Sequence, residues 1–231
     1  MTGPEANGSK PVIAVIDYGI GNLRSAQKAL DHVGAQAHLT SDSDLIASAD
    51  GVVLPGVGAF GACMNALRSD GLDADVFAAV ASGRPFLGIC VGMQMLFEGS
   101  EESPDIGGLG ILPGTVRWLP ESVKRPQMQW NRLTLTVEER HGSMAEEMLV
   151  GLDGTWMYFV HSLAAEVGPD TVATVEYGGP VAAAVARGNV FATQFHPEKS
   201  ARPGLGLLRN FVSVCRKSDA GRPAGSEAIA S

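Results

Sequence analysis

One cysteine stands where a buried strand meets a helix, in the segment RPFLGICVGMQML, residues 84–96. The apolar run before Cys90 is typical of a buried strand, and the residues after it have helical character. A helix N-terminus carries a partial positive charge, which favours a thiolate over a thiol. Gly88 and Gly92 flank the cysteine in the pattern Gly-x-Cys-x-Gly, as in a strand–turn–helix elbow that exposes a nucleophile. Cys90 is therefore a candidate nucleophile, with a buried structural cysteine as the alternative.

A histidine and a glutamate form a second candidate group, in TQFHPEKS, residues 193–200. A strand is expected to run up to His196, where Pro197 stops its pairing. Residues two apart in an extended segment face the same side, so we expect Glu198 to lie beside the imidazole. A carboxylate in that place orients the ring and stabilises its protonated form. The alternative is a surface histidine beside a surface glutamate.

A glycine-rich turn, LPGVGAF (54–60), follows another apolar strand. Such a turn lets backbone N–H groups point into a site, as an oxyanion hole requires, although a plain strand-to-helix loop has the same pattern. The three segments together supply a nucleophile, a base with its orienting acid, and oxyanion donors. That combination indicates acyl transfer from a small, amide-like substrate.

These groups meet only if the strands that carry them end at one edge of a sheet. Strands alternate with helices in the first half, which predicts a parallel sheet with helices on both faces. Strands crowd together in the second half, which predicts an added mixed or antiparallel region and then a closing helix at 204–217. The expected fold is a three-layer, flavodoxin-like α/β fold with expected strands at 12–16, 35–39, 51–55, 85–90, 132–137, 156–162, 171–177, 180–186 and 190–195.

The composition limits the other possibilities. The 231 residues predict one domain at 12–217 between flexible tails at 1–11 and 218–231. A net charge of −8 argues against a nucleic-acid partner, and no apolar run approaches the roughly 20 residues that span a membrane. Three cysteines without a CxxC pair predict no disulfide framework, no metal site and a reducing, cytoplasmic location. No cofactor is expected, and the acidic stretch 98–105 is interpreted as a solvated loop.

With these motifs, the sequence resembles the class I (triad) glutamine amidotransferases, and within them the glutaminase subunits of imidazole glycerol phosphate synthase. The resemblance covers about residues 12–214. It rests on DYGIGN (17–22), LPGVGAFG (54–61), LGICVGMQMLFEGSEE (87–102), GLGILPG (108–114), MQWN (128–131), YFVHS (158–162) and QFHPEKS (194–200).

The resemblance implies the class I amidotransferase fold and hydrolysis of L-glutamine to glutamate and ammonia through a cysteine thioester. It implies a heterodimer in which a cyclase subunit, a (β/α)₈ barrel, uses the ammonia to make imidazole glycerol phosphate and aminoimidazole carboxamide ribotide for histidine biosynthesis. Carried over by position, it implies Cys90 as nucleophile, His196 as base and acid, and Glu198 as the orienting residue.

The same resemblance assigns the remaining site residues. It implies the Val91 N–H and the Gly56–Val57 peptide as oxyanion donors, with that peptide reorienting when the partner is engaged. The residues implied to hold the amino-acid end of glutamine are Gly58, Gln94, His161 and Ser162, and those implied to lie toward the partner are Asn22, Trp130 and Lys199.

The chain departs from the family pattern at a few positions. Gln127 and Gln129 stand in QMQWN where HMGWN is expected, and Leu163 stands where a tyrosine is expected after VHS. Three alternatives remain open: a stand-alone cysteine hydrolase or peptidase, a non-catalytic binding module, and an amidotransferase that supplies another synthase. The presence of Cys90, His196 and Glu198 together argues against the non-catalytic module.

Overall fold

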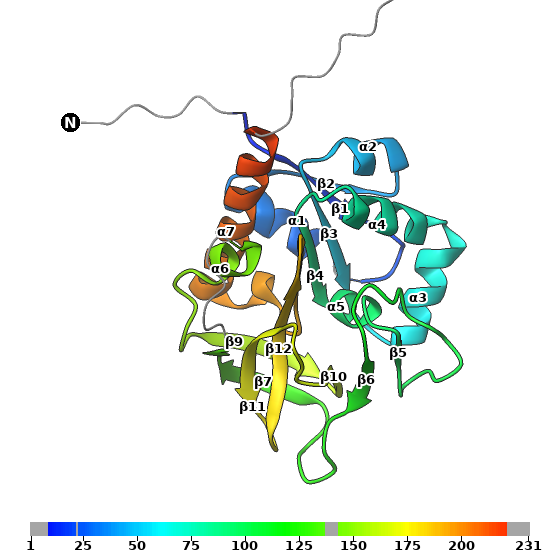
Figure 1. Ribbon diagram of the computed structural model, residues 1–231, viewed down its shortest axis with the longest axis vertical. Coiled ribbons are helices and arrows are strands. Elements are labelled where there is room, and N and C mark those ends of the chain that lie inside the picture. The colour runs from blue at the N-terminus through cyan, green and yellow to red at the C-terminus, as the bar shows by residue number, and fades with distance from the viewer. Residues whose placement is uncertain (1–8, 22, 137–142, 221–231) are drawn as a thin grey trace, which may run out of the picture.

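The computed structural model describes residues 9–21, 23–136 and 143–220 (Figure 1). Its centre is an eight-stranded sheet in the order β2-β1-β3-β4-β13-β12-β11-β8. The first five strands in that order are parallel, and the last three are antiparallel additions. The strands are β1 (Val12–Ile16), β2 (Gln36–Thr40), β3 (Gly51–Gly56), β4 (Phe86–Cys90), β8 (Thr134–Leu135), β11 (Thr171–Glu176), β12 (Pro180–Arg187) and β13 (Val190–Thr193).

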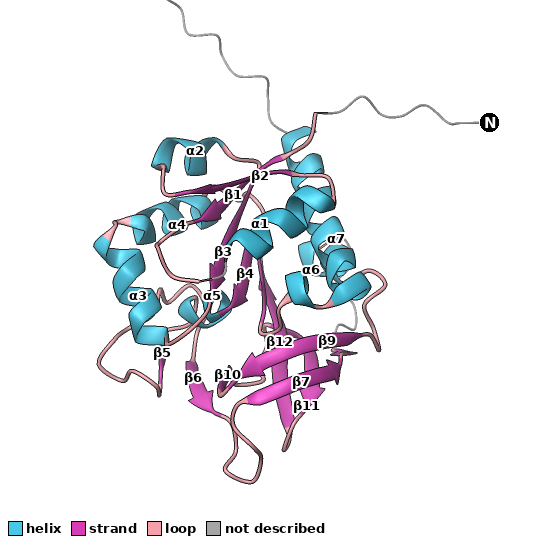
Figure 2. Cartoon of the chain, turned by 180° about the vertical axis from the view of Figure 1, so that it is seen from behind, coloured by secondary structure: helices cyan, strands magenta, loops and turns pink. Residues whose placement is uncertain are grey.

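Helices cover both faces of this sheet. One group, α1 (Leu23–His32), α6 (Met144–Leu149) and α7 (Ala201–Ala220), packs together on one side. The other group, α2 (Ser43–Ser48), α3 (Phe60–Ser69), α4 (Leu72–Ala81) and the short α5 (Val91–Met95), lies on the opposite side (Figures 1 and 2). Asp42 begins α2 by accepting hydrogen bonds from the Asp44 and Leu45 N–H groups, an N-terminal cap typical of aspartate. The three-layer α/β fold predicted from the sequence is confirmed.

Two small sheets extend the fold beyond the end of the central sheet from which Cys90 emerges (Figure 2). One pairs β7 (Gln127–Arg132) with β9 (Trp156–His161) in antiparallel fashion. The other joins β5 (Gly99–Ser100), β6 (Thr115–Trp118) and β10 (Leu163–Ala165) in the order β10-β6-β5. We call these two units the accessory sheets. They matter because β9 and the connection to β10 face the functional site.

The second half of the chain was the harder half to predict. The single strand expected at 132–137 is wrong, because β7 occupies Gln127–Arg132 and β8 is a separate pair of residues in the central sheet. The sequence of β7, QMQWNR, is mostly polar and exposed, so it lacks the β-branched apolar pattern of a buried strand. The helix α6 was also not expected, and β13 ends at Thr193 rather than 195. The predicted tails, 1–11 and 218–231, lie largely outside the described residues.

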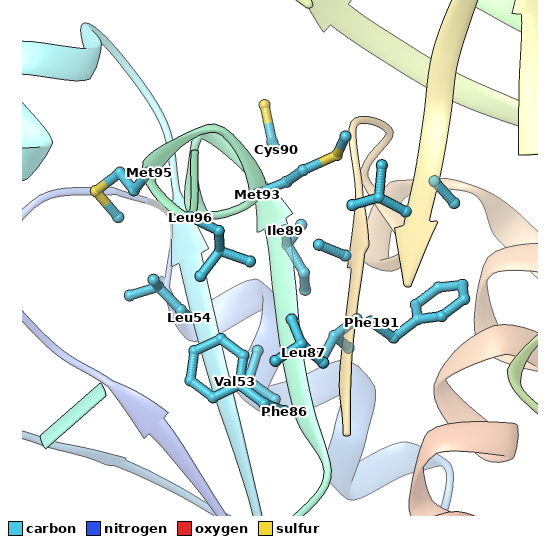
Figure 3. Close-up of a cluster of buried hydrophobic side chains, with 14 of the residues drawn as sticks. Val53, Leu54, Phe86, Leu87, Ile89, Cys90, Met93, Met95, Leu96 and Phe191 are labelled. Carbon is cyan, nitrogen blue, oxygen red and sulfur yellow. The ribbon is translucent and has the colours of Figure 1, made fainter. Parts of the chain in front are cut away.

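The hydrophobic core lies along the central strands. Val53, Leu87 and Phe191 come from β3, β4 and β13 and pack beneath the α5 turn (Figure 3). Cys63 and Cys215 are fully buried in helices of this core. Within the described residues, no helix is long and apolar enough to cross a membrane.

Candidate active site

The candidate nucleophile stands at the turn from β4 into α5. Cys90 has φ 56° and ψ −111°, a backbone conformation that L-residues rarely adopt and that marks a strained elbow. Its sulfur points away from the apolar core at the tip of β4 (Figure 3). The flanking glycines serve close packing: a Cβ on Gly92 would collide with the Leu54 carbonyl oxygen. A Cβ on Gly88 would lie 3.0 Å from the Ala192 Cβ and 3.2 Å from the Gly92 carbonyl oxygen, so both glycines allow neighbouring atoms to pack closely.

The predicted base and its orienting acid lie together. His196 Nδ1 is 2.8 Å from Glu198 Oε1, and both side chains are almost fully buried. The extended geometry expected for this segment is wrong, because Pro197–Lys199 form a 3₁₀ turn directly after His196. The turn folds Glu198 back toward the imidazole, so the contact forms for a different geometric reason. Nδ1 is engaged by the carboxylate, which leaves Nε2 as the ring atom available to a neighbouring thiol.

The protonation of His196 depends on the same neighbours. Burial acts to lower the pKa of the imidazole, because it disfavours the charged ring. The interactions with the Cys90 sulfur and the Glu198 carboxylate outweigh burial and raise the pKa of His196 to about 9. At neutral pH the geometry therefore favours an imidazolium at His196. Such a ring holds a proton that it can give to a leaving group.

The glycine-rich turn lies directly beside the elbow, because Gly56 pairs with Cys90 in the parallel β3–β4 register. A Cβ on Gly56 would approach the Gly92 nitrogen to 2.7 Å, so only glycine fits there. Two side chains bind the backbone carbonyls on either side of the Gly56–Val57 peptide. The Tyr18 hydroxyl donates to the Pro55 oxygen at 2.7 Å, and the Cys63 thiol donates to the Val57 oxygen at 3.4 Å. The Gly56–Val57 peptide lies between these two fixed points.

Around these groups lies a pocket of about 390 Å³. It contains both Cys90 and His196, and one charged side chain of each sign, Glu102 and Lys199, also lines it. Glu102 accepts a hydrogen bond from the Phe60 N–H at 2.6 Å. The pocket is lined by Val57, Gly58, Cys90, Val91, Gln94, Glu102, Pro126, Val160, His161, Ser162, Leu163, His196 and Lys199.

One part of the pocket wall is organised by the Leu163 carbonyl. This oxygen accepts from Gln94 Nε2 at 3.0 Å and from His161 Nδ1 at 2.8 Å. Since a carbonyl can only accept, His161 carries its proton on Nδ1. Burial, its largest influence, lowers the pKa of His161 to about 4, so this imidazole is neutral at physiological pH.

Comparison with known proteins identifies the family. Residues 14–215 match the model of the glutamine amidotransferase class-I family. The imidazole glycerol phosphate synthase subunit HisH of Methanothermobacter thermautotrophicus is 45% identical over 206 residues, covering 89% of this chain and all of the relative. The HisH subunit of Salinibacter ruber is 44% identical over 218 residues, covering 90% of this chain and 97% of the relative. The chain belongs to the class I glutamine amidotransferases.

Solved structures agree with this fold. PurLQS from Thermotoga maritima superposes with a TM-score of 0.69 at 20% identity, covering 91% of this chain and 99% of that one. The CTPS glutaminase domain of Trypanosoma brucei, solved with bound acivicin, gives a TM-score of 0.62 at 15% identity and covers 93% of this chain and 96% of that one. At these identities the likeness concerns the class I amidotransferase fold alone.

The structure brings most of the predicted site residues of this amidotransferase together. Gly56 lies beside the elbow, and Lys199, although exposed, reaches the pocket. Trp130 does not line the pocket; it is 45% exposed on β7. Asn22 lies outside the described residues. The predicted residues that line the pocket are Val57, Gly58, Cys90, Val91, Gln94, His161, Ser162 and His196.

Several residues of this amidotransferase site were not singled out in the sequence. The acidic stretch 98–105 was interpreted as a solvated loop, which is wrong for Glu102 because it lines the pocket. Tyr18 and Cys63 hold the glycine-rich turn, and Gln194 contacts the Cys90 sulfur. The sequence gives one indication of their roles: Tyr18 and Gln194 lie inside the motifs DYGIGN and QFHPEKS, which carry the family resemblance.

Proposed function

We propose that this chain is the glutaminase subunit of imidazole glycerol phosphate synthase, hydrolysing L-glutamine through a thioester on Cys90. The observation that carries the proposal is that the buried Cys90 and His196 line one pocket and that the buried Glu198 carboxylate contacts His196 Nδ1. The similarity to HisH subunits, about 45% over most of the chain, supports the choice of substrate and pathway. The ammonia formed passes to a cyclase subunit.

The chemistry runs in two halves. The Cys90 thiolate attacks the side-chain amide carbon of glutamine, and the C–N bond breaks as the His196 imidazolium gives its proton to the leaving ammonia. The resulting thioester joins the glutamyl group to the sulfur. His196, now neutral, takes a proton from water, the hydroxide attacks the thioester, and Cys90 leaves as a thiolate with release of glutamate. The raised pKa of His196 suits its first role as proton donor.

The pocket offers complementary groups for the amino-acid end of the substrate. Gln94 lines the pocket while its Nε2 bonds to other acceptors, which leaves Oε1 to face an α-ammonium group. The Glu102 carboxylate on the same wall attracts that charge. Backbone groups around Gly58, His161 and Ser162 meet the α-carboxylate. The neutral His161 adds no positive charge to this end of the pocket.

The Gly56–Val57 peptide and the Val91 N–H supply the oxyanion donors in this proposal. Tyr18 and Cys63 fix the carbonyls of Pro55 and Val57, so rotation is confined to the single peptide between them. One oxyanion donor is worth about 10²–10³ in rate. A peptide turned away from the pocket therefore keeps the free subunit slow, and docking of the partner turns it inward.

The accessory sheets supply a docking surface for the cyclase, which we take to be a (β/α)₈ barrel forming a heterodimer with this chain. Cross-strand pairing places Met128 opposite Val160 and Trp130 opposite Tyr158. Met128 is 63% exposed, and Val160 lines the catalytic pocket. The apolar surface thus continues into the pocket mouth. A partner seated on it covers the route by which ammonia leaves, with Lys199 at the rim. Together with a cytoplasmic location, this fits biosynthesis that releases no free ammonia.

A variant without the thiol tests this proposal. Replacing Cys90 with alanine removes the nucleophile and leaves the partner surface intact. In the reconstituted complex, Cys90→Ala should abolish glutamine-dependent synthesis and retain synthesis from added ammonium salt. Cys215→Ala is the matched control, because that thiol is buried in the core on α7 and should leave both activities unchanged. Retention of glutamine-dependent synthesis by Cys90→Ala would refute the nucleophile.

A further inference from the structure

A buried glutamine next to the nucleophile has no role in the mechanism above. Gln194 lies between the end of β13 and His196 and is fully buried. Its Nε2 is 3.9 Å from the Cys90 sulfur, within hydrogen-bond range for sulfur. Its backbone N–H is fixed by the Ala183 carbonyl of β12 at 2.9 Å. The side chain therefore reaches the sulfur from a rigid part of the central sheet.

The direction of this amide is set by a second glutamine. Gln94 Nε2 lies 3.0 Å from the Leu163 carbonyl oxygen and 3.0 Å from Gln194 Oε1. The Leu163 carbonyl only accepts, so the Gln94 atom beside it is the amide NH₂. That NH₂ in turn needs an acceptor at Gln194, so the Gln194 oxygen points to Gln94. The NH₂ of Gln194 is left to face Cys90.

We propose that Gln194 is a thiolate-stabilising residue of the amidotransferase reaction, and that Gln94 is the positioning residue that keeps its N–H group directed at the Cys90 sulfur. An N–H donor stabilises a thiolate more than a thiol, because a charged acceptor makes the stronger hydrogen bond. The orientation of the Gln194 amide is essential, because a reversed amide would direct its oxygen at the thiolate and repel it. This inference rests on the proposed nucleophile and deepens the account of its activation.

Other groups also act on the Cys90 thiolate, and these groups are unchanged in the glutamine variants that are compared below. His196 interacts with the sulfur most directly, and Tyr18 and Cys63 are close enough to feel its charge. Glu102 and Lys199 line the same pocket. Because His196 interacts with the sulfur, a measured alkylation midpoint reflects both groups and not the thiol alone. The difference in alkylation midpoint between the wild type and the Gln194 or Gln94 variants isolates the contribution of the amide.

The test is the pH dependence of Cys90 alkylation by iodoacetamide in the full chain, followed by mass spectrometry of the Cys90 peptide. Gln194→Leu removes the donor at similar volume. The alkylation midpoint should rise by about one pH unit, and turnover of glutamine by the complex near neutral pH should fall about tenfold and recover as the pH rises. Gln127→Leu is the matched control, because Gln127 on β7 is also fully buried but its amide makes no hydrogen bond among the described residues. Its midpoint should stay at the wild-type value.

A double-variant cycle tests the orienting role of Gln94. In Gln94→Glu the carboxylate can only accept, so Gln194 turns its NH₂ toward residue 94 and its oxygen toward the sulfur. The midpoint should rise by about one pH unit or more in the wild-type background, and by clearly less in the Gln194→Leu background. Equal shifts in both backgrounds would show a direct charge effect and overturn the relay through Gln194.

The outcomes separate this inference from the proposed function. Alkylation needs no glutamine, so it reports the thiolate even if the physiological substrate is different. An unchanged midpoint in Gln194→Leu, with glutamine still used by the wild-type complex, would overturn the inference alone. If Gln194→Leu fails to fold, as judged by thermal unfolding, the midpoint of Gln94→Leu decides, because this variant removes the orienting NH₂ without adding a charge and leaves Gln194 in place; its midpoint should then also rise. An unshifted midpoint there also counts against the inference.

Discussion

The two sides of the pocket are built in opposite ways. On one side lies the strand-end cluster, Gly56, Cys90 and His196, at the carboxyl ends of β3, β4 and β13. Its polar groups are held by the central sheet and its helices: Glu198 holds His196, and Gln194 contacts Cys90. His196 Nε2 is the unbonded ring atom, and it is the one available to the thiol. The thiol, the base and its orienting acid are thus already assembled on this side.

The accessory sheets on the other side leave groups without partners. Both amide atoms of the fully buried Gln127 and the Nε2 atom of His161 make no hydrogen bond among the described residues. Seven large apolar side chains are exposed among the described residues. Four of them belong to the accessory sheets: Trp118, Met128, Trp130 and Trp156. On the strand-end side the unbonded atoms, His196 Nε2 and Glu198 Oε2, belong to the base and its orienting acid, which already contact each other. We therefore expect the base and acid to be assembled in the free chain, whereas the accessory-sheet side is completed by substrate and partner.

The largest expected effect lies at the elbow. In Gly92→Ala the new Cβ meets the Leu54 carbonyl oxygen, and the nearest atoms are all backbone of Leu54 and Pro55, which cannot move aside as a side chain would. We expect a loss of more than about 3 kcal/mol in the free energy of unfolding, measured with urea, and loss of glutaminase activity. Gly99→Ala is the control, since no heavy atom lies within 4 Å of its Cβ position. Near-wild-type stability in Gly92→Ala would show that the strand-end cluster is not tightly packed.

A second, smaller effect concerns the orienting acid. Glu198→Ala removes one of the two interactions that raise the pKa of His196 above its usual value. The variant imidazole loses its proton at lower pH, so the alkaline limb of the kcat–pH profile should move from about pH 9 toward neutrality. Near neutral pH, kcat should fall about 10²-fold, less than for loss of Cys90 or His196.

The exposed Glu166 supplies the comparison for this change, because its partner is the surface residue Arg117. Glu166→Ala should keep both kcat and the alkaline limb. An alkaline limb that does not move in Glu198→Ala would mean that the carboxylate does not set the protonation of His196.

The same contrast explains what the sequence could predict. The strand-end cluster was predictable because each part is a local motif: an apolar strand followed by Gly-x-Cys-x-Gly, or a strand followed by His-Pro-Glu. Parallel strands then bring their carboxyl ends to one edge, so the motifs meet without any knowledge of long-range contacts. Even the mistaken extended geometry at His196 did not matter, since Glu198 is only two residues away.

The accessory sheets depend on contacts between distant segments. The β7 strand has a polar, exposed sequence, and it forms only because β9 pairs with it. Glu102 reaches the pocket from an acidic segment typical of a solvated loop, and Gln194 is oriented by Gln94, 100 residues away. Such long-range pairings produce no hydrophobic periodicity and no turn motif in the local sequence. They become visible only once the fold has placed the segments.

The third prediction tests the partner side. Trp130→Ser removes an aromatic anchor from the exposed face of β7 and should weaken binding of the cyclase subunit about 10- to 100-fold, measured by calorimetry. Basal glutaminase activity of the free chain should not change, because Trp130 does not line the pocket. Phe77→Ser is the matched control: Phe77 is 46% exposed on α4, nearly the same as Trp130 at 45%, but lies far from the accessory sheets. Equal weakening in both variants would place the partner elsewhere.

The smallest effect is expected at Gln127, and it sharpens the contrast between two buried glutamines. The Gln194 amide has partners at both ends, whereas the Gln127 amide has none among the described residues. Burying a polar group without a partner costs about 1–3 kcal/mol, and replacing it with an apolar side chain of similar shape recovers part of that cost. Gln127→Leu should therefore leave the free energy of unfolding unchanged or raise it by about 1 kcal/mol, while Gln194→Leu should lower it. Urea titration of both variants compares them directly. A clear loss of stability in Gln127→Leu would show that the accessory sheets satisfy this amide after all, and the contrast between the two buried glutamines would then disappear.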